Sequence, residues 1–155
     1  MDDPDTVATP AAPRYMGFWA RVLASVIDSV LIVVVLLPIV FLLYGEQLLE
    51  TGGQLDTGAN LLFNQVLPTC AIIAFWLLKS ATPGKLMLGG VIVDADTLAK
   101  PALWQWLVRY AGYFISTLLL FLGFLWVAWD PRKQGFHDKL ARTVVIYRNP
   151  GGGSD

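Results

Sequence analysis

The chain has 155 residues, of which 55% are hydrophobic and 15% charged, whereas a soluble domain is about 45–50% apolar and about 25% charged. This balance predicts an integral membrane protein instead of a globular one, and the length allows a single domain. The formal net charge of −1 offers no basic surface for nucleic acid, and the lone Cys70 excludes an internal disulfide.

Residues 1–13 are predicted to be a disordered tail, because they are acidic, rich in proline and have little to bury. A first helix is predicted over residues 18–44. Its apolar stretch Val22–Leu43 is about 22 residues long, and about 20 helical residues cross the hydrocarbon core of a bilayer. A polar loop, Gly45–Ala59, and a second transmembrane helix over residues 61–78 are predicted to follow.

Asp28 is the one charge inside the first apolar stretch, where an ionisable side chain costs about 2.5–3.5 kcal/mol. Arg21 lies two turns earlier on the same helical face. Two interpretations of Asp28 stay open. It pairs with Arg21 or another base and fixes helix packing, or it binds a cation or relays a proton. The hydroxyls of Ser25 and Ser29 would serve either arrangement.

The second connection, Lys79–Pro101, contains the run Thr82-Pro83-Gly84-Lys85. It lacks the other glycines of a phosphate-binding loop, so we expect it to turn the chain out of the membrane, with Lys85 at anionic headgroups. A third helical membrane segment is predicted over residues 103–129, entered through an interfacial turn that carries Arg109. Gly123 would break this segment, which is therefore either a full span or re-entrant.

Two short runs are strand-like, Val91–Val93 and Thr143–Tyr147. Because an isolated strand is unstable, we expect them to pair as a small two-stranded sheet on one side of the membrane. All eleven Lys and Arg residues lie in the N-terminal segment, the second connection with its flanking turn, or the C-terminal tail. The positive-inside rule places these parts in the cytoplasm and loop 45–59 outside, whereas three full crossings would put the tail outside. The Gly-rich end, residues 149–155, is predicted to be flexible.

Three blocks of the chain carry a resemblance to a known family: Gly17–Asp28, then Thr82–Lys85 followed by Val91–Asp94, and finally Arg132–Val145. In this order and spacing they resemble the RDD family of small bacterial membrane proteins, over about Tyr15–Tyr147. That family is named for an arginine and two aspartates, which the resemblance places on Arg21, Asp28 and Asp138. It implies a single RDD-like domain over residues 14–148 in the bacterial cytoplasmic (inner) membrane.

The residue that the resemblance adds, Asp138, extends the predicted charge network. If the tail lies inside, Arg21 would bridge Asp28 and Asp138 through its forked donors; otherwise it is a snorkelling anchor at the interface. His137 and Asp138 lack a third ligand for zinc, so Asp138 is expected to cap a short helix, residues 138–142. No metal site and no cofactor are predicted.

The predicted function is that of an accessory, structural or assembly subunit of a membrane complex, because so small a bundle leaves little room for an enclosed transport path. The alternative is a small homo-oligomeric transporter that exchanges cations and protons through Asp28, since the resemblance implies transport and cation/proton antiport is ascribed to some members. An enzyme is not expected, because no nucleophile–base set is visible. The expected partners are the lipid bilayer and other membrane subunits or further copies of the chain, and not nucleic acid.

Overall fold

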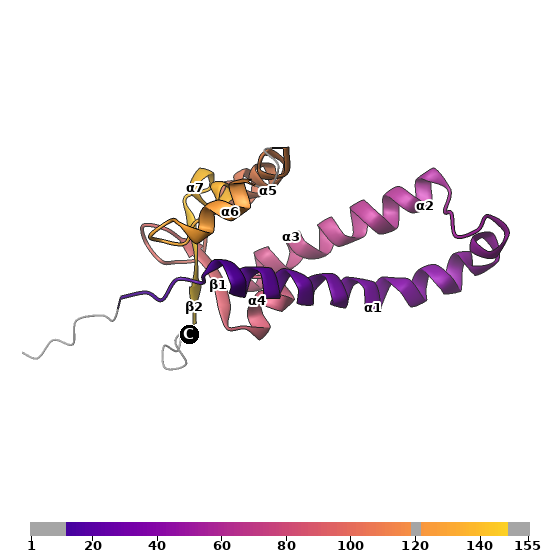
Figure 1. The fold of residues 1–155 in the computed structure, drawn as a ribbon, viewed down its shortest axis with the longest axis horizontal. Helices are drawn as coiled ribbons and strands as arrows, with labels where there is room; N and C mark the ends of the chain where they lie inside the picture. Colours follow the sequence, from indigo (N-terminus) through magenta and orange to yellow (C-terminus); the bar gives the residue numbers. More distant parts are fainter. Residues whose placement is uncertain (1–11, 119–121, 149–155) are drawn as a thin grey trace, which may run out of the picture.

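The computed structural model describes residues 12–118 and 122–148. Most of the predicted disordered tail and the whole flexible end, residues 149–155, lie outside the described residues. The fold is mainly helical, with a long helical hairpin at one end and a two-stranded sheet, packed with short helices, at the other (Figure 1).

The hairpin consists of two stretches that are each long and apolar enough to cross a membrane. The first is α1 (Phe18–Glu50). The second, Thr57–Lys79, is built from three consecutive elements, α2 (Thr57–Leu61), the π-helical turn η1 (Leu62–Val66) and α3 (Leu67–Lys79). Both membrane helices predicted from the sequence are therefore present, with shifted ends.

The shifted ends have local causes. Helix α1 runs to Glu50 instead of residue 44, because the polar run after Gly45 is rich in Glu, Gln and Leu, which are good helix formers. The loop is shorter than expected, and Gly52 and Gly53 turn it with φ angles of 68° and 95°. Asp56 then caps α2 by accepting a hydrogen bond from the Ala59 amide at 2.9 Å.

The π-helical turn lies next to Pro68. Proline has no amide hydrogen, so the carbonyl four residues earlier loses its α-helical donor. The Leu67 amide instead bonds the carbonyl of Leu62, five residues back. The second stretch therefore absorbs a proline without ending.

The third membrane segment is bent. Helix α5 (Leu103–Leu118) is followed by α6 (Leu122–Leu125) and the 3-10 turn η2 (Trp126–Ala128), and the two halves form an angle of 114°. The third membrane segment predicted over residues 103–129 is therefore present as two helical halves, which form a broken span or a re-entrant segment. A Cβ on Gly123 would lie 2.7 Å from the Ser116 Oγ, so this glycine lets the two halves approach closely.

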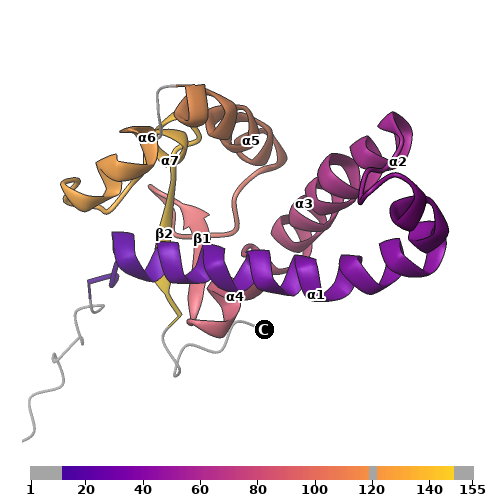
Figure 2. The ribbon, with the colours of Figure 1, turned by 45° about the vertical axis from the view of Figure 1, so that its right-hand side comes forward.

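The two predicted strands pair as expected. β1 (Gly90–Asp94) runs antiparallel to β2 (Thr143–Tyr147), with Gly90 opposite Tyr147. The N-terminal segment joins them, because Tyr15 bridges Ile146 and the Met16 amide donates to the Val145 carbonyl at 2.8 Å. The N-terminal segment, the second connection and the tail thus meet at one end of the long helices (Figure 2).

Two short helices complete this end, α4 (Pro83–Met87) beside α1 and α7 (Phe136–Leu140) beside α5. The core at this end is formed by six apolar residues, each from a different segment: Met16, Ala24, Trp76, Ile92, Trp106 and Val145. This small core holds together parts of the chain that the sequence separates widely, and it positions the charged residues described next.

Candidate functional site

Asp138 is the centre of a buried ion-pair network. It is the third residue of α7 and is fully buried. Its carboxylate accepts a hydrogen bond from the Gly135 amide at 2.9 Å. It also forms two ion pairs, one with Arg21 at 2.5 Å and a short one with Arg109. The short helix predicted over residues 138–142 begins at Phe136 and ends at Leu140. Besides accepting the Gly135 amide at the start of this helix, Asp138 is the counter-ion of two arginines.

Arg21 ties the start of α1 to the C-terminal tail. Besides Asp138, its guanidinium donates to the carbonyl of Met16 at 3.0 Å and to the carbonyl of Lys133 at 2.7 Å. Within the described residues, Arg21 does not contact Asp28, so the predicted pair and the predicted bridge are both corrected. Helical side chains lean toward the N-terminus of their helix, and Arg21 therefore reaches away from Asp28.

Asp28 binds neutral donors instead of a base. Its two oxygens accept hydrogen bonds from the Thr82 hydroxyl at 2.5 Å and from the Gly84 amide at 2.6 Å. A Cβ on Gly84 would lie 2.1 Å from the carbonyl oxygen of Ala24, so only glycine lets α4 approach α1 this closely. Asp28 thus fixes α4 against α1, and the run that contains Thr82 and Gly84 supplies both donors.

Arg109 is the second cation on Asp138, and it comes from α5. Its side chain is fully buried and also donates to the Thr143 hydroxyl at 2.7 Å. Its guanidinium carbon lies 5.7 Å from the centre of the Trp76 ring and 5.8 Å from that of Tyr113. The sequence placed Arg109 at the interface, but nothing local to α5 indicated that it would face Asp138.

His137 is buried as a neutral ring. It stacks on Tyr113 with the ring centres 4.3 Å apart, and burial lowers its pKa to about 3, outweighing the opposite effect of Asp138. Burial by itself would raise the pKa of Asp138, but the guanidiniums of Arg109 and Arg21 overcome this and hold it well below its usual range. The pair is therefore a neutral imidazole beside a carboxylate that stays ionised.

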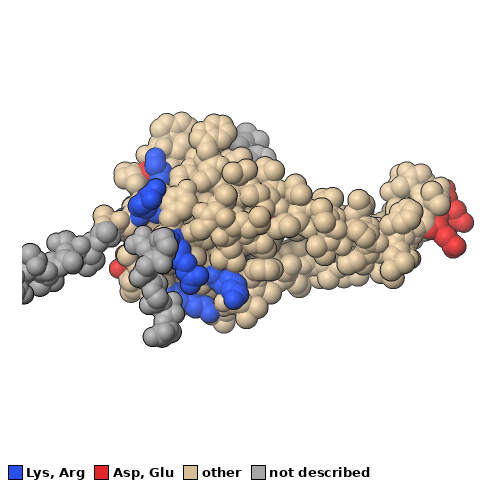
Figure 3. All heavy atoms as spheres, turned by 90° about the horizontal axis from the view of Figure 1, so that it is seen from below, with Lys and Arg blue, Asp and Glu red and all other residues tan. Residues whose placement is uncertain are grey.

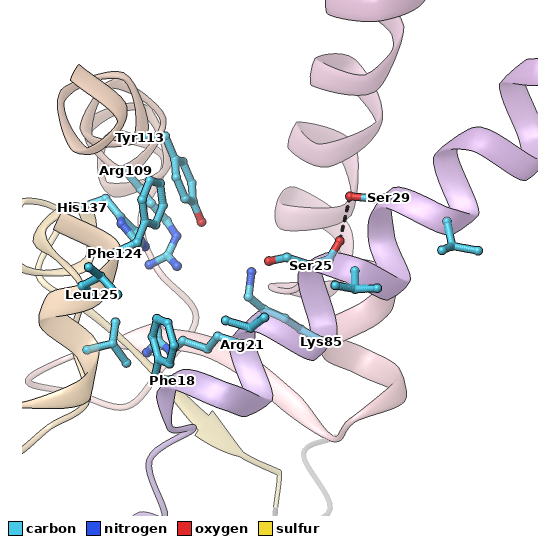
Figure 4. Close-up of a pocket in the computed structure, with 14 residues that line it drawn as sticks. Phe18, Arg21, Ser25, Ser29, Lys85, Arg109, Tyr113, Phe124, Leu125 and His137 are labelled. Carbon is cyan, nitrogen blue, oxygen red and sulfur yellow. Dashed lines mark hydrogen bonds between the residues drawn. The ribbon is translucent and has the colours of Figure 1, made fainter. Parts of the chain in front are cut away.

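A cavity of about 590 Å³ lies beside this network, between α1 and the α5–α6 pair. The side chains of Lys85 and Tyr113 point into it from opposite sides, and Arg21 and Arg109 also line it (Figure 4). Ser25 and Ser29 line the α1 wall, and the Ser29 hydroxyl donates to the carbonyl of Ser25 at 2.9 Å. In the described structure these two hydroxyls do not contact Asp28, so they do not support it in the predicted way.

The remaining charges separate along the molecule. Exposed Lys and Arg side chains gather around the sheet end, and acidic side chains gather at the tip of the helical hairpin (Figure 3). In residues 12–118 and 122–148, no three His, Cys, Asp or Glu side chains come together in a way that could hold a metal ion.

Comparisons with known proteins give one family and a few relatives. The family model described as RDD family matches residues 15–142. The uncharacterized protein YxaI of Bacillus subtilis is 26% identical over 151 residues, covering 85% of this chain and 97% of that protein. The uncharacterized protein RP437 of Rickettsia prowazekii is 37% identical over 82 residues, which are 52% of this chain and 45% of that protein.

A proline-rich antigen homolog of Mycobacterium tuberculosis is 32% identical over 63 residues, which are 41% of this chain and 26% of that protein. The chain therefore spans less than half of the Rickettsia and Mycobacterium proteins, but almost all of the Bacillus protein. No solved structure matches.

Proposed function

The chain belongs to the RDD family, and from this premise we propose that it is a non-enzymatic accessory or assembly subunit of a membrane complex. The two apolar helices require a lipid bilayer around them. In this proposal the ion pairs of Asp138 and the contact between Asp28 and α4 act together as a clamp. The clamp holds the sheet, α4 and α7 against the ends of the membrane helices.

The observation that carries the proposal is the bonding of Asp28. Each oxygen of Asp28 accepts one hydrogen bond, from the Thr82 hydroxyl or from the Gly84 amide, so this carboxylate joins α4 to α1. Asp138 is fully buried between two arginines. Both carboxylates therefore support a structural role, which favours the subunit over a cation/proton exchanger.

The outer surface of the hairpin supports association with other membrane proteins. None of the most apolar 18-residue window of α1 is buried inside the structure, and only 11% of the corresponding window of Thr57–Lys79 is. These helices are therefore free to contact lipid, other subunits or further copies of the chain. Van der Waals packing between such helices can drive association within a bilayer.

We further propose that the sheet end lies in the cytoplasm of a bacterium and the hairpin tip outside its inner membrane. The gathering of Lys and Arg at the sheet end and of acids at the tip (Figure 3) supports this orientation through the positive-inside rule. This orientation predicts that a reporter that works only in the cytoplasm is active when fused after residue 155. Activity of a periplasmic phosphatase fused at the same position would refute it.

The variant Asp28→Asn tests the proposed function. Asn keeps one side-chain oxygen but puts an amide opposite one of the two donors, so α4 should loosen from α1. We expect the purified variant to lose the membrane subunits that co-purify with the wild type, which the mass of the purified complex measures. We also expect proteoliposomes that contain the wild-type protein to show no pH-dependent cation flux. The exposed Asp96→Asn is the matched control and should change neither property.

The opposite pattern would contradict the proposal. If wild-type protein carried a pH-dependent cation flux that Asp28→Asn abolished, while the mass of the assembly and its thermal stability stayed unchanged, the transporter alternative would be correct.

A further inference from the structure

The cavity between α1 and the α5–α6 pair has a polar end and an apolar wall. Its volume of about 590 Å³ falls within the roughly 300–1,000 Å³ of small-molecule sites. Val22, Val26 and Val30 of α1 form the apolar wall at helical spacing. The eight-residue separation of Val22 and Val30 corresponds to about 12 Å along the helix. The wall therefore runs from the charged end of α1 into its apolar stretch.

The polar end has an excess of positive charge. Three bases line the cavity, Arg21, Lys85 and Arg109, and none of its described lining residues is acidic. The carboxylate of Asp138 lies behind the arginines and pairs with both. The two arginines share this one carboxylate, and Lys85 adds a third basic side chain, so the polar end of the cavity attracts an anion.

Two of these bases have donors without partners. Lys85 is only 7% exposed, and within the described residues its ammonium forms no hydrogen bond or ion pair. Burial lowers its pKa. In the same part of the structure, the Nε and Nη2 atoms of the fully buried Arg109 lack hydrogen-bond partners. Buried donors without acceptors cost folding free energy. An oxyanion bound in the cavity would supply an acceptor for the Lys85 ammonium and a negative charge near the guanidinium of Arg109.

A charged end and an apolar wall together fit an amphiphile. We propose that this cavity binds an anionic phospholipid, with the phosphate of its headgroup near Lys85 and Arg109 and one acyl chain along the valine wall of α1. This assigns Lys85 to a cavity within the protein, whereas the sequence alone placed it at the headgroups of the surrounding membrane. The proposal does not depend on the subunit role, because either a subunit or a transporter could hold such a lipid.

The test is lipid binding to the purified full chain in an uncharged detergent, followed by native mass spectrometry. The probes are phosphatidylglycerol, phosphatidylcholine with the same acyl chains, and inorganic phosphate. We expect phosphatidylglycerol to bind at least tenfold more tightly than phosphatidylcholine. Lys85→Met should weaken phosphatidylglycerol binding about tenfold, the effect of losing one charge-assisted hydrogen bond, and Lys85→Arg should largely retain it.

Lys79→Met is the matched control, because Lys79 is exposed at the end of α3 and does not line the cavity. It should leave binding unchanged. Thermal unfolding accompanies each measurement, and Lys85→Met should unfold at a higher temperature than wild type, since it removes a buried unpaired charge. Lost binding in that variant would then not reflect misfolding.

Four results would overturn the proposal. Equal binding of the two lipids, or unchanged binding in Lys85→Met, would show that the cavity does not recognise the anionic headgroup. An equal loss in Lys79→Met would show general attraction of acidic lipid to a basic surface. Inorganic phosphate that displaces phosphatidylglycerol at comparable concentration would identify a soluble anion as the ligand.

Discussion

Replacing Asp138 by Asn should strongly destabilise the protein, because it removes the counter-ion of two arginines at once. Arg109 is 0% exposed and Arg21 is 8% exposed, so neither can be fully rehydrated while the fold persists. Breaking a buried ion pair by removing one partner costs about 3–5 kcal/mol. Arg21 keeps its bonds to the carbonyls of Met16 and Lys133, so most of this cost falls on Arg109.

A loss of about 3–5 kcal/mol would consume a large part of the roughly 5–15 kcal/mol that stabilises a typical domain. Denaturant unfolding in detergent measures it, as a lower midpoint with an unchanged slope. Asp96→Asn makes the same chemical change at an exposed position and should stay within about 0.5 kcal/mol of wild type.

The double variant Asp138→Asn/Arg109→Met separates the cause from general damage. It removes the stranded buried charge, so it should be more stable than Asp138→Asn alone, as replacement of buried ion pairs by apolar groups often is. The reasoning is refuted if Asp138→Asn lies within about 1 kcal/mol of wild type, or if the two substitutions simply add.

Two further predictions concern α4 and the buried histidine. Gly84→Ala would place a Cβ 2.1 Å from the Ala24 carbonyl oxygen and 3.0 Å from Asp28 Cγ, so it should push α4 off α1 and lower the unfolding midpoint. Gly45→Ala inside α1 is the control, because its Cβ would have the Phe41 ring as its nearest neighbour, at 3.9 Å. It should raise stability by up to about 1 kcal/mol. If the two variants change stability alike, close packing at Gly84 is not what holds α4 against α1. Burial holds the pKa of His137 at about 3, below about 6.5 in the unfolded chain, so as pH falls through this range the unfolded state binds a proton that the native state does not. Stability should drop by about 2 kcal/mol between pH 8 and pH 5, before Asp138 begins to contribute. A His137→Gln variant with the same pH profile as wild type would show that another group is responsible.

Several features followed from local sequence. The lengths and hydrophobicity of residues 18–44 and 61–78 were sufficient to identify two membrane helices, because a bilayer selects apolar segments of a set length. The strand pairing also followed, since Val91–Val93 and Thr143–Tyr147 were the only strand-like runs and neither is stable alone. The ends of the helices were less accurate, because they depend on capping residues such as Asp56.

The charge network required the tertiary structure. Arg21 and Asp28 are close in the sequence and share a helical face, yet Arg21 pairs with Asp138, which is 117 positions away. Asp28 instead bonds Thr82 and Gly84, more than 50 positions away. Helix α5 packs against α7, which places Arg109 beside Asp138, and α1, α4, α5 and α6 together line the cavity.

The sequence by itself therefore determined that the protein lies in a membrane and that it carries the pattern of its family, because the length of an apolar segment and a short motif are local properties. Which charges meet was decided by the tertiary structure, because a side chain's partner depends on the direction in which its helix points it and on which distant segments pack there. Lys85, whose ammonium has no partner among the described residues and lies beside an apolar wall, belongs to this second class. It became visible only when α1, α4 and α5 were placed around one cavity.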